Sequence, residues 1–246
     1  MIWIGTSGWV YNHWIGCFYP LDLPQSAWLA YYAGRFPTVE INRSFYRLPT
    51  RRNFHDWAWK AGHNEQFLFA VKASRYLTHF KKLYAPEDAI HRLFSAADGL
   101  GLRLGPVLFQ LPPGFGVDPV RLSYFISRLP YGCRAAFEFR DHSWYREDII
   151  RILNDAGCAL VRAVGGYYTP LEVPDTGSFS YVRVHGGLYG VGLSDGELHF
   201  WAERFAGEAA GGRDVYVYFN NDPDCHAIND AHRLRGLLWS TGMVAP

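Results

Sequence analysis

The sequence predicts a single parallel α/β barrel of the (β/α)8, or TIM-barrel, type. Runs typical of β-strands alternate with segments of helical periodicity from end to end, a pattern that builds a parallel sheet with helical crossovers. Eight such runs can be counted. The 246 residues are also close to the ~250 residues typical of this fold. We therefore expect one TIM-barrel domain over residues 1–246.

The expected strands are short runs bounded by turn-forming residues. They cover residues 2–6, 38–42, 67–72, 106–111, 135–139, 159–163, 180–185 and 214–220. A doubly wound open sheet would show the same alternation. However, no junction between a strand and a helix carries the G-x-G-x-x-G pattern or a Walker A loop, so eight units and this length favour closure into a barrel.

The expected helices carry apolar residues at positions i, i+3, i+4 and i+7, the spacing of one helix face. Four sets show it: Leu29, Tyr32, Ala33 and Phe36; Ile90, Leu93, Phe94 and Ala97; Leu122, Phe125, Ile126 and Leu129; and Leu198, Trp201, Ala202 and Phe205. Start signals agree, because prolines suit first helical positions, short polar side chains suit N-caps and acidic residues favour the positive helix end. These are Pro86 and Pro119, Asp118 and Ser143, and Glu87, Asp88, Glu147 and Asp148.

The charge and cysteine content narrow the class of protein. The 24 Lys and Arg against 23 Asp and Glu give a net charge of +1, far from the strongly basic surface of a dedicated duplex binder.

Cys17, Cys133, Cys158 and Cys225 show no C-x-x-C spacing, and the chain opens on a strand-like run rather than a signal peptide. No apolar run approaches the roughly 18 residues of a membrane span. We expect reduced thiols, a cytoplasmic location and no membrane partner.

Polar residues at the strand ends predict the functional face. Active groups of a parallel barrel lie at the C-terminal ends of its strands, and residues of the same parity along a strand share a face. Both rules bring one set of side chains to a single mouth: Glu40, Asn42, Lys72, Gln110, Glu138, Arg140, Arg183, His185, Tyr218 and Asn220. Their three cations and two carboxylates leave a net positive charge, which favours an anionic ligand.

The same ring leaves two other interpretations open. Lys72, Arg140 and Arg183 could neutralise Glu40 and Glu138 in a buried ion-pair layer that holds the barrel together, although burying so many charges is costly. This structural interpretation and a functional one are compatible. By residue type, Glu40, Glu138 and His185 could also form a minimal metal site, but the positive charge disfavours a divalent metal, and we predict none.

Loops extend the predicted mouth. The glycine-rich stretch 185–192, with Gly186 and Gly187, follows the seventh strand, where many barrels bind phosphate through backbone N–H groups; it could equally be an ordinary turn. The first loop, 8–20, is aromatic, so Trp9 could stack on a sugar or base, or the loop could pack as a lid. His79, with Arg75, would extend the cationic rim or be a plain surface group.

The two carboxylates also suggest a chemistry. Glu40 and Glu138 lie three strands apart, which would put them on opposing walls, as glycosidic hydrolysis requires. Neighbouring Arg140 and Lys72 favour their ionised forms, which suits a base or nucleophile better than an acid. His185 is then the natural proton donor, because the usual pKa of histidine lies nearest neutrality.

Ordered motifs run along nearly the whole chain. They are GTSGW (5–9), GCFYP (16–20), EIN (40–42) with Phe45 and Tyr46, Lys72, TH (78–79), GPVLFQLPP (105–113), EFR (138–140) with Ser143 and Trp144, RVHG (183–186) and YFNN (218–221). Together they resemble the YecE-like family, the domain of unknown function number 72. The resemblance implies a TIM barrel but no established reaction. Asp141 departs from the pattern, because similar sequences often carry His there.

The leading hypothesis is an enzyme without metal or cofactor that acts on a small anionic or polyhydroxylated substrate, phosphate- or sugar-like, by hydrolase- or lyase-type chemistry. In it, the cations of the ring bind charge, and Glu40, Glu138 and His185 transfer protons. The alternative is a nucleic-acid-binding or processing barrel that resembles endonuclease IV, which the near-neutral charge disfavours. A barrel that only binds a regulatory metabolite is not separable from the first hypothesis by sequence.

Overall fold

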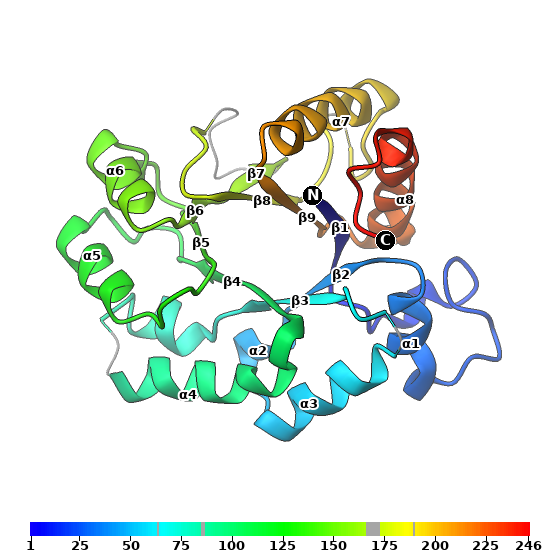
Figure 1. Cartoon of the computed structure of the whole chain (residues 1–246), viewed down its shortest axis with the longest axis horizontal. Coiled ribbons are helices and arrows are strands. Elements are labelled where there is room, and N and C mark those ends of the chain that lie inside the picture. Colours follow the sequence, from blue (N-terminus) through cyan, green and yellow to red (C-terminus); the bar gives the residue numbers. More distant parts are fainter. Residues whose placement is uncertain (63, 85–86, 166–172, 189) are drawn as a thin grey trace.

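A nearly closed parallel barrel forms the centre of the molecule. The computed structural model describes residues 1–62, 64–84, 87–165, 173–188 and 190–246. Within them, nine strands form one parallel sheet that is bent into a ring, and helices cover its outside (Figure 1). The predicted class, a parallel α/β barrel, is confirmed in this coarser form, while the expected count of eight strands differs from the nine observed.

The strands follow one another around the ring in the order β6-β5-β4-β3-β2-β1-β9-β8-β7. They are β1 (Ile2–Ser7), β2 (Thr38–Ile41), β3 (Leu68–Lys72), β4 (Leu104–Gln110), β5 (Ala135–Glu138), β6 (Ala159–Leu160), β7 (Arg162–Val164), β8 (Phe179–Val184) and β9 (Asp214–Phe219). The nine strands include all eight expected runs, with boundaries shifted by one or two residues.

The ninth strand arises from a division of the run 159–163. Its first half, β6, pairs with β5, and its second half, β7, pairs with β8. Val161 lies between them, and its N–H still donates to the carbonyl of Phe137 at 2.9 Å. The chain therefore changes partner within one extended run, and the two ends of the strand order are neighbours in sequence.

Eight α-helices are seen among the described residues. They are α1 (Trp28–Ala33), α2 (Arg43–Tyr46), α3 (Arg51–Lys60), α4 (Glu87–Ala97), α5 (Pro119–Ser127), α6 (Glu147–Asp155), α7 (Asp195–Ala210) and α8 (His226–Leu238). The four periodic segments correspond to α1, α4, α5 and α7. Asp118 caps α5 by accepting from the N–H of Arg121, with Pro119 in the first turn. Pro86 lies outside the described residues.

The prediction that Ser143 caps a helix is wrong. The cap belongs to Asp141, whose Oδ1 accepts from the Ser143 N–H at 3.0 Å and from its hydroxyl at 2.6 Å. Ser143 lies inside the short 3₁₀ turn His142–Trp144, and α6 begins four residues after it. The side chain that departs from the family pattern thus has a local structural role, because it fixes the turn after β5.

The buried apolar side chains form two clusters. The larger lies between the strands and the helices. The smaller fills the lower barrel and includes Ala70, Leu108, Ala136, Tyr181 and Tyr218. These inner residues have the parity that the sequence analysis assigned to the inner face, so the face assignment is confirmed and the polar residues above them point into the mouth.

The expectation of four reduced thiols is wrong for two of them. Cys17 in the first loop and Cys225 before α8 form a disulfide, with Cα atoms 6.7 Å apart. Cys133 and Cys158 are free, and burial raises the pKa of each thiol to about 12. The sequence could not show the pairing, because the two bonded cysteines are 208 residues apart.

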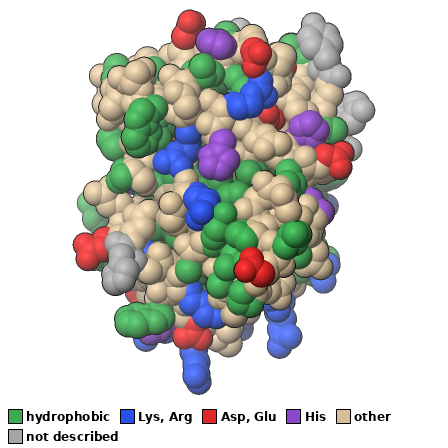
Figure 2. Space-filling view, turned by 90° about the vertical axis from the view of Figure 1, so that its right-hand side faces the viewer, with side chains coloured by type: hydrophobic (Ala, Val, Ile, Leu, Met, Phe, Trp, Pro, Cys, Tyr) green, Lys and Arg blue, Asp and Glu red, His purple; other side chains and the backbone are tan. Residues whose placement is uncertain are grey.

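The surface mixes charges of both signs on the side where α1 and α8 lie. Figure 2 shows acidic and basic side chains interspersed there, in keeping with the balanced composition. Among the described residues, no helix is long and apolar enough to cross a membrane.

Candidate functional site

Arg183 on β8 bridges two buried carboxylates inside the barrel mouth. Its Nε donates to Oε2 of Glu40 at 3.0 Å, and its Nη2 donates to Oε1 of the same carboxylate at 2.9 Å. Its Nη1 donates to Oε2 of Glu138 at 2.8 Å. All three side chains are at most 2% exposed. The ion-pair layer that the sequence left open is therefore present.

Glu40 on β2 has no acceptor position left for a ligand. Besides the bidentate guanidinium, Oε1 accepts from the Ser7 hydroxyl at 2.8 Å and Oε2 from the Tyr181 hydroxyl at 2.7 Å. Burial opposes ionisation, but Arg183 and then Lys72 outweigh it and hold the pKa of Glu40 below its usual range. A carboxylate has about four lone-pair sites, so Glu40 is an ionised anchor in this arrangement.

Glu138 on β5 joins the layer to the rim. Its Oε1 accepts from Nε and Nη2 of Arg140, both at 2.9 Å. Burial again opposes ionisation, but Arg183 and Arg140 outweigh it and lower the pKa of Glu138 to about 2. The carboxylates expected on opposing walls of a glycosidase site thus share the Arg183 guanidinium between them, and this side chain takes the space that a glycosidic bond would need.

Lys72, at the end of β3, carries the surplus charge of the site. Its Nζ lies 4.4 Å from the centre of the Phe45 ring, and it forms no hydrogen bond or ion pair with a described residue. Burial and then Arg183 lower its pKa to about 8. Because Arg183 and Arg140 balance the two carboxylates, Lys72 leaves the mouth with one net positive charge, as the sequence predicts.

His185 follows β8 at the rim, and its environment changes the role expected of it. Nδ2 of Asn220 lies 3.1 Å from its Nδ1, so Nδ1 accepts and Nε2 carries the hydrogen of the neutral ring. Burial and then Arg183 lower its pKa to about 4, below the usual histidine value from which its role as proton donor was expected. Nε2 is buried without a partner among the described residues, 4.0 Å from Oε1 of Glu138.

Three other predicted residues lie at the same mouth. Asn42 donates from Nδ2 to the Ser7 carbonyl at 3.1 Å, and its Oδ1 is buried without a partner among the described residues. Gln110 is buried, and its side chain makes no hydrogen bond to a described residue. His79 has its Nδ1 2.9 Å from the Thr78 hydroxyl, and burial and then Lys72 lower its pKa. The mouth therefore holds several polar groups that a ligand could satisfy.

Two predicted contacts belong to the core instead. Tyr218 is fully buried one layer below, with its hydroxyl 2.8 Å from that of Thr38. Trp9 is 8% exposed and packs edge-on against Trp57 and Phe69 outside the barrel. Neither ring is available for stacking on a ligand, because neighbouring side chains cover both.

The glycine-rich loop uses its amides internally. Gly187 N–H donates to the Gly190 carbonyl at 3.0 Å, and Leu188 N–H donates to Oε1 of Glu197 at 2.7 Å. Gly186 packs closely on Gly165, because a Cβ added to Gly165 would lie 2.4 Å from the carbonyl oxygen of Gly186. Tyr189 lies outside the described residues. These contacts favour the ordinary-turn interpretation at Gly187 over a phosphate cradle.

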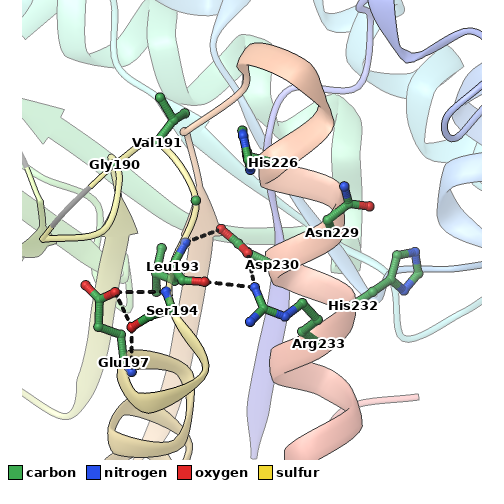
Figure 3. Close-up of a pocket in the computed structure, with 11 residues that line it drawn as sticks. Gly190, Val191, Leu193, Ser194, Glu197, His226, Asn229, Asp230, His232 and Arg233 are labelled. Atoms are coloured by element: carbon green, nitrogen blue, oxygen red, sulfur yellow. Dashed lines mark hydrogen bonds and ion pairs between the residues drawn. The ribbon is translucent and has the colours of Figure 1, made fainter.

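A groove of about 890 Å³ lies between this loop and α8 (Figure 3). Some of its polar groups are paired with one another, whereas the side chains of His226, Asn229 and His232 make no hydrogen bond to a described residue. Asp230 accepts from the Leu193 N–H at 2.9 Å, and Arg233 donates to the Leu193 carbonyl and to Asp230, both at 2.8 Å. This network fixes the loop to α8 and supports the wall of the mouth.

Sequence reasoning missed three residues that shape the site. Ser7 ends β1, and Tyr181 has the inner parity of β8; the parity rule would have found both. Tyr11, in the aromatic first loop, donates its hydroxyl to the Ser7 carbonyl, and its pKa is raised by burial and by Asp222 and Glu40. Only the folded position of the loop shows that contact.

The residues do not form a preassembled metal site. Among the described residues, no group of three His, Cys, Asp or Glu side chains is placed to hold a metal ion. Glu40 and Glu138 would first have to release Arg183, and a cation would have to enter beside Lys72.

Comparison with known proteins places the chain among proteins of the same fold and length. Residues 3–244 match the family described as "Protein of unknown function DUF72". The UPF0759 protein YunF of Bacillus subtilis (strain 168) is 26% identical, over 97% of this chain and 95% of that protein. A DUF72 family crystal structure from Thermotoga maritima MSB8 superimposes with a TM-score of 0.86 at 27% identity, covering 97% of this chain and 99% of the other. One from Enterococcus faecalis V583 gives 0.80 at 19%, covering 97% and 95%.

Proposed function

Because the chain belongs to the DUF72 family, whose description brings no reaction with it, we propose a function from the site alone. The protein is an enzyme that binds a small anionic, hydroxyl-bearing molecule, phosphate- or sugar-like, at the carboxyl-terminal mouth of the barrel. The observation that carries this proposal is the Lys72 ammonium, which is partly buried at the mouth and has no carboxylate partner among the described residues. A buried charge is normally paired, so an anionic ligand is the natural partner.

The groups around Lys72 suit a ligand that also carries hydroxyls. The buried Oδ1 of Asn42 accepts a hydrogen bond and the buried Nε2–H of His185 donates one, and neither has a partner among the described residues. A buried polar atom without a partner costs about 1–3 kcal/mol. A ligand that satisfies both atoms and balances Lys72 gains this free energy on binding.

The shifted pKa values support proton transfer at Lys72. With a pKa of about 8, Lys72 is mainly the ammonium at pH 7, which is the form that binds the anion, and this ammonium can donate a proton to the substrate. The charge left on a substrate oxygen would be stabilised by the Nε2–H of neutral His185. Glu40 and Glu138 hold the cations in place. This division of roles favours lyase- or isomerase-type proton transfer over glycosidic hydrolysis.

Thermal unfolding against phosphosugars and sugar acids tests the binding step. A ligand at ~100 times its Kd adds about 2.7 kcal/mol of stability, and Lys72→Met should abolish this gain. The matched control is Lys60→Met, at an exposed position on α3, which should keep it. Equal stabilisation of both variants would contradict the proposal, and so would a Glu138→Gln variant with unchanged ligand binding and activity.

The pH dependence of binding provides a second test. Only the ammonium form of Lys72 attracts the anion, so ligand affinity should fall by about tenfold per pH unit above pH 8. The fall should be absent in Lys72→Arg, which stays charged. An affinity that is constant between pH 7 and 10 would show that Lys72 does not hold the anion.

A further inference from the structure

We propose that a surface beside the mouth binds single-stranded nucleic acid. The surface, called the aromatic groove here, is formed by α2, the turn after β3 and α4. Its defining residues are Phe45, Tyr46, Arg75, Tyr76, Phe80 and Arg92, which line a groove of about 310 Å³. None of them belongs to the Glu40–Arg183–Glu138 layer, so this proposal is separate from the function proposed for the mouth.

Large aromatic rings are left in solvent on this surface. Tyr46 is 69% exposed, Phe80 is 66% exposed and Tyr76 is 38% exposed, although each lies next to the others around one groove. Contiguous exposed rings of this kind mark interaction surfaces in soluble proteins. Exposed rings also provide the flat faces on which unpaired bases stack, whatever their sequence.

The two stretches that carry the exposed rings are positive, while the first turn of α4 adds Glu87 and Asp88. The stretches 41–55 and 73–84 contain no Asp or Glu. Their cations near the groove, together with one from α4, are Arg43, Arg47, Arg75, Lys81 and Arg92. None forms an ion pair with a described residue, whereas Arg146 on another face is paired with Asp148 at 3.0 Å. In a chain of net charge +1 this is a local field that complements phosphates.

Cations and rings are interleaved rather than separated. The Arg75 guanidinium lies 5.4 Å from the centre of the Phe80 ring, and Lys81 Nζ lies 5.6 Å from that of Tyr76. A strand that stacks its bases on such rings places its backbone phosphates near the cations. An acidic peptide would explain the cations but not the exposed rings. A duplex needs a broader basic face than a groove of this size offers.

Phe45 connects the aromatic groove with the mouth. Its ring lies 5.1 Å from that of Tyr46, 4.9 Å from that of His79 and 4.4 Å from Lys72 Nζ. The first loop was expected to provide the ring for base stacking, but Trp9 is buried between the strands and the helices. The stacking surface is instead built by the short helix and the turn that follow β2 and β3, whose C-terminal ends form one side of the mouth.

Fluorescence anisotropy with a labelled oligothymidylate of about 12 nucleotides tests the proposal on the full chain. We expect binding at about 50 mM salt, with log K falling against log salt with a slope of about −2 for three phosphate contacts. Affinity should then drop roughly 16-fold at about 200 mM. Tyr46→Ala with Phe80→Ala should weaken binding at least about tenfold with the slope kept, because these rings stack bases. Arg75→Ala with Arg92→Ala should weaken it and reduce the slope.

Matched controls keep the outcomes distinct. Tyr131→Ala removes a fully exposed ring just before β5, at the opposite end of the barrel, and Arg151→Ala removes an exposed cation from α6; both should bind as the wild type does. Glu138→Gln should also bind the oligonucleotide normally, even if it disables the mouth. The proposal is overturned by absence of binding at low salt, by a polyglutamate peptide that competes equally well, or by an aromatic double variant that binds normally.

Discussion

Replacing Arg183 by Met tests whether the bridge holds the barrel mouth together. The substitution removes three hydrogen bonds and leaves Glu40 and Glu138, each at most 1% exposed, without their shared cation. Breaking a buried ion pair by removing one partner costs about 3–5 kcal/mol. Both carboxylates lose the same partner here, so we expect a loss of unfolding free energy near the upper end, about 4–5 kcal/mol at pH 7.

The loss should depend on pH in a defined direction. In the wild type the folded-state pKa of Glu138 is lowered from 4.5 to about 2. Its ionisation therefore contributes stability that is fully present above pH 4.5 and is lost as the pH falls through 2, about 3 kcal/mol in total. In Arg183→Met the main cation that offsets the burial of Glu40 and Glu138 is absent, so the pKa values of both carboxyl groups rise. Protonation of these carboxyl groups removes the buried charges from the variant, so its free energy of unfolding should differ less from that of the wild type at pH 4 than at pH 7.

Urea unfolding followed by tryptophan fluorescence at pH 7 and pH 4 measures both effects. The control Arg146→Met removes a surface ion pair and should cost no more than about 1 kcal/mol. Adding Glu40→Gln and Glu138→Gln to Arg183→Met should recover part of the loss, which keeps the test valid if the single variant is poorly folded. A loss below about 1 kcal/mol at pH 7, or one equal at both pH values, would refute the reasoning.

Three other changes have expected outcomes. The Cys17–Cys225 disulfide closes a separation of 208 residues, so its reduction should lower the free energy of unfolding by up to about 5 kcal/mol through loop entropy. Thermal melting with and without dithiothreitol measures this loss. The double variant Cys17→Ser/Cys225→Ser is the control and should not respond to the reductant. Trp144→Ala should cost about 3–5 kcal/mol, because the buried ring stacks on Phe139 at 4.5 Å and donates to a backbone carbonyl; denaturant titration decides it, and a loss under 1 kcal/mol would contradict it. Asp118→Ala should cost about 1 kcal/mol through the lost cap of α5, whereas Asp118→Asn should retain most of that stability in the same titration.

The alternation of side chains along strands explains how much of the site the sequence could predict. Glu40, Lys72, Glu138 and Arg183 lie on the inner face because successive residues of a strand point to opposite faces. The C-terminal ends of parallel strands meet at one mouth, so residues from distant strands could be assigned to one ring. The same rule placed Tyr218 inside but not at the right depth, because parity gives the face and not the layer.

Pairing among the charges could not be predicted, because it depends on the reach of side chains across the barrel. The sequence gives three cations and two carboxylates, and any cation could have been the surplus one. In the fold the long Arg183 side chain spans both carboxylates, and Arg140 reaches Glu138 from two residues beyond the end of β5. Lys72 is left over as a result. The lowered pKa of His185 could not be predicted either, since burial and then Arg183 cause it.

The buried layer of Glu40, Arg183 and Glu138 and the chemistry proposed for the mouth therefore depend on each other, and the structural and functional interpretations do not compete. Arg183 is, after burial, the largest cause that lowers the pKa of both Lys72 and His185, while Glu40 and Glu138 act in the opposite direction on both groups. The layer beneath the mouth, in which Arg183 and Arg140 balance the two carboxylates, holds these opposing charges in place. It follows that a substitution in the layer should move the pKa of Lys72 even when the barrel stays folded, because the layer sets the field in which the amine titrates.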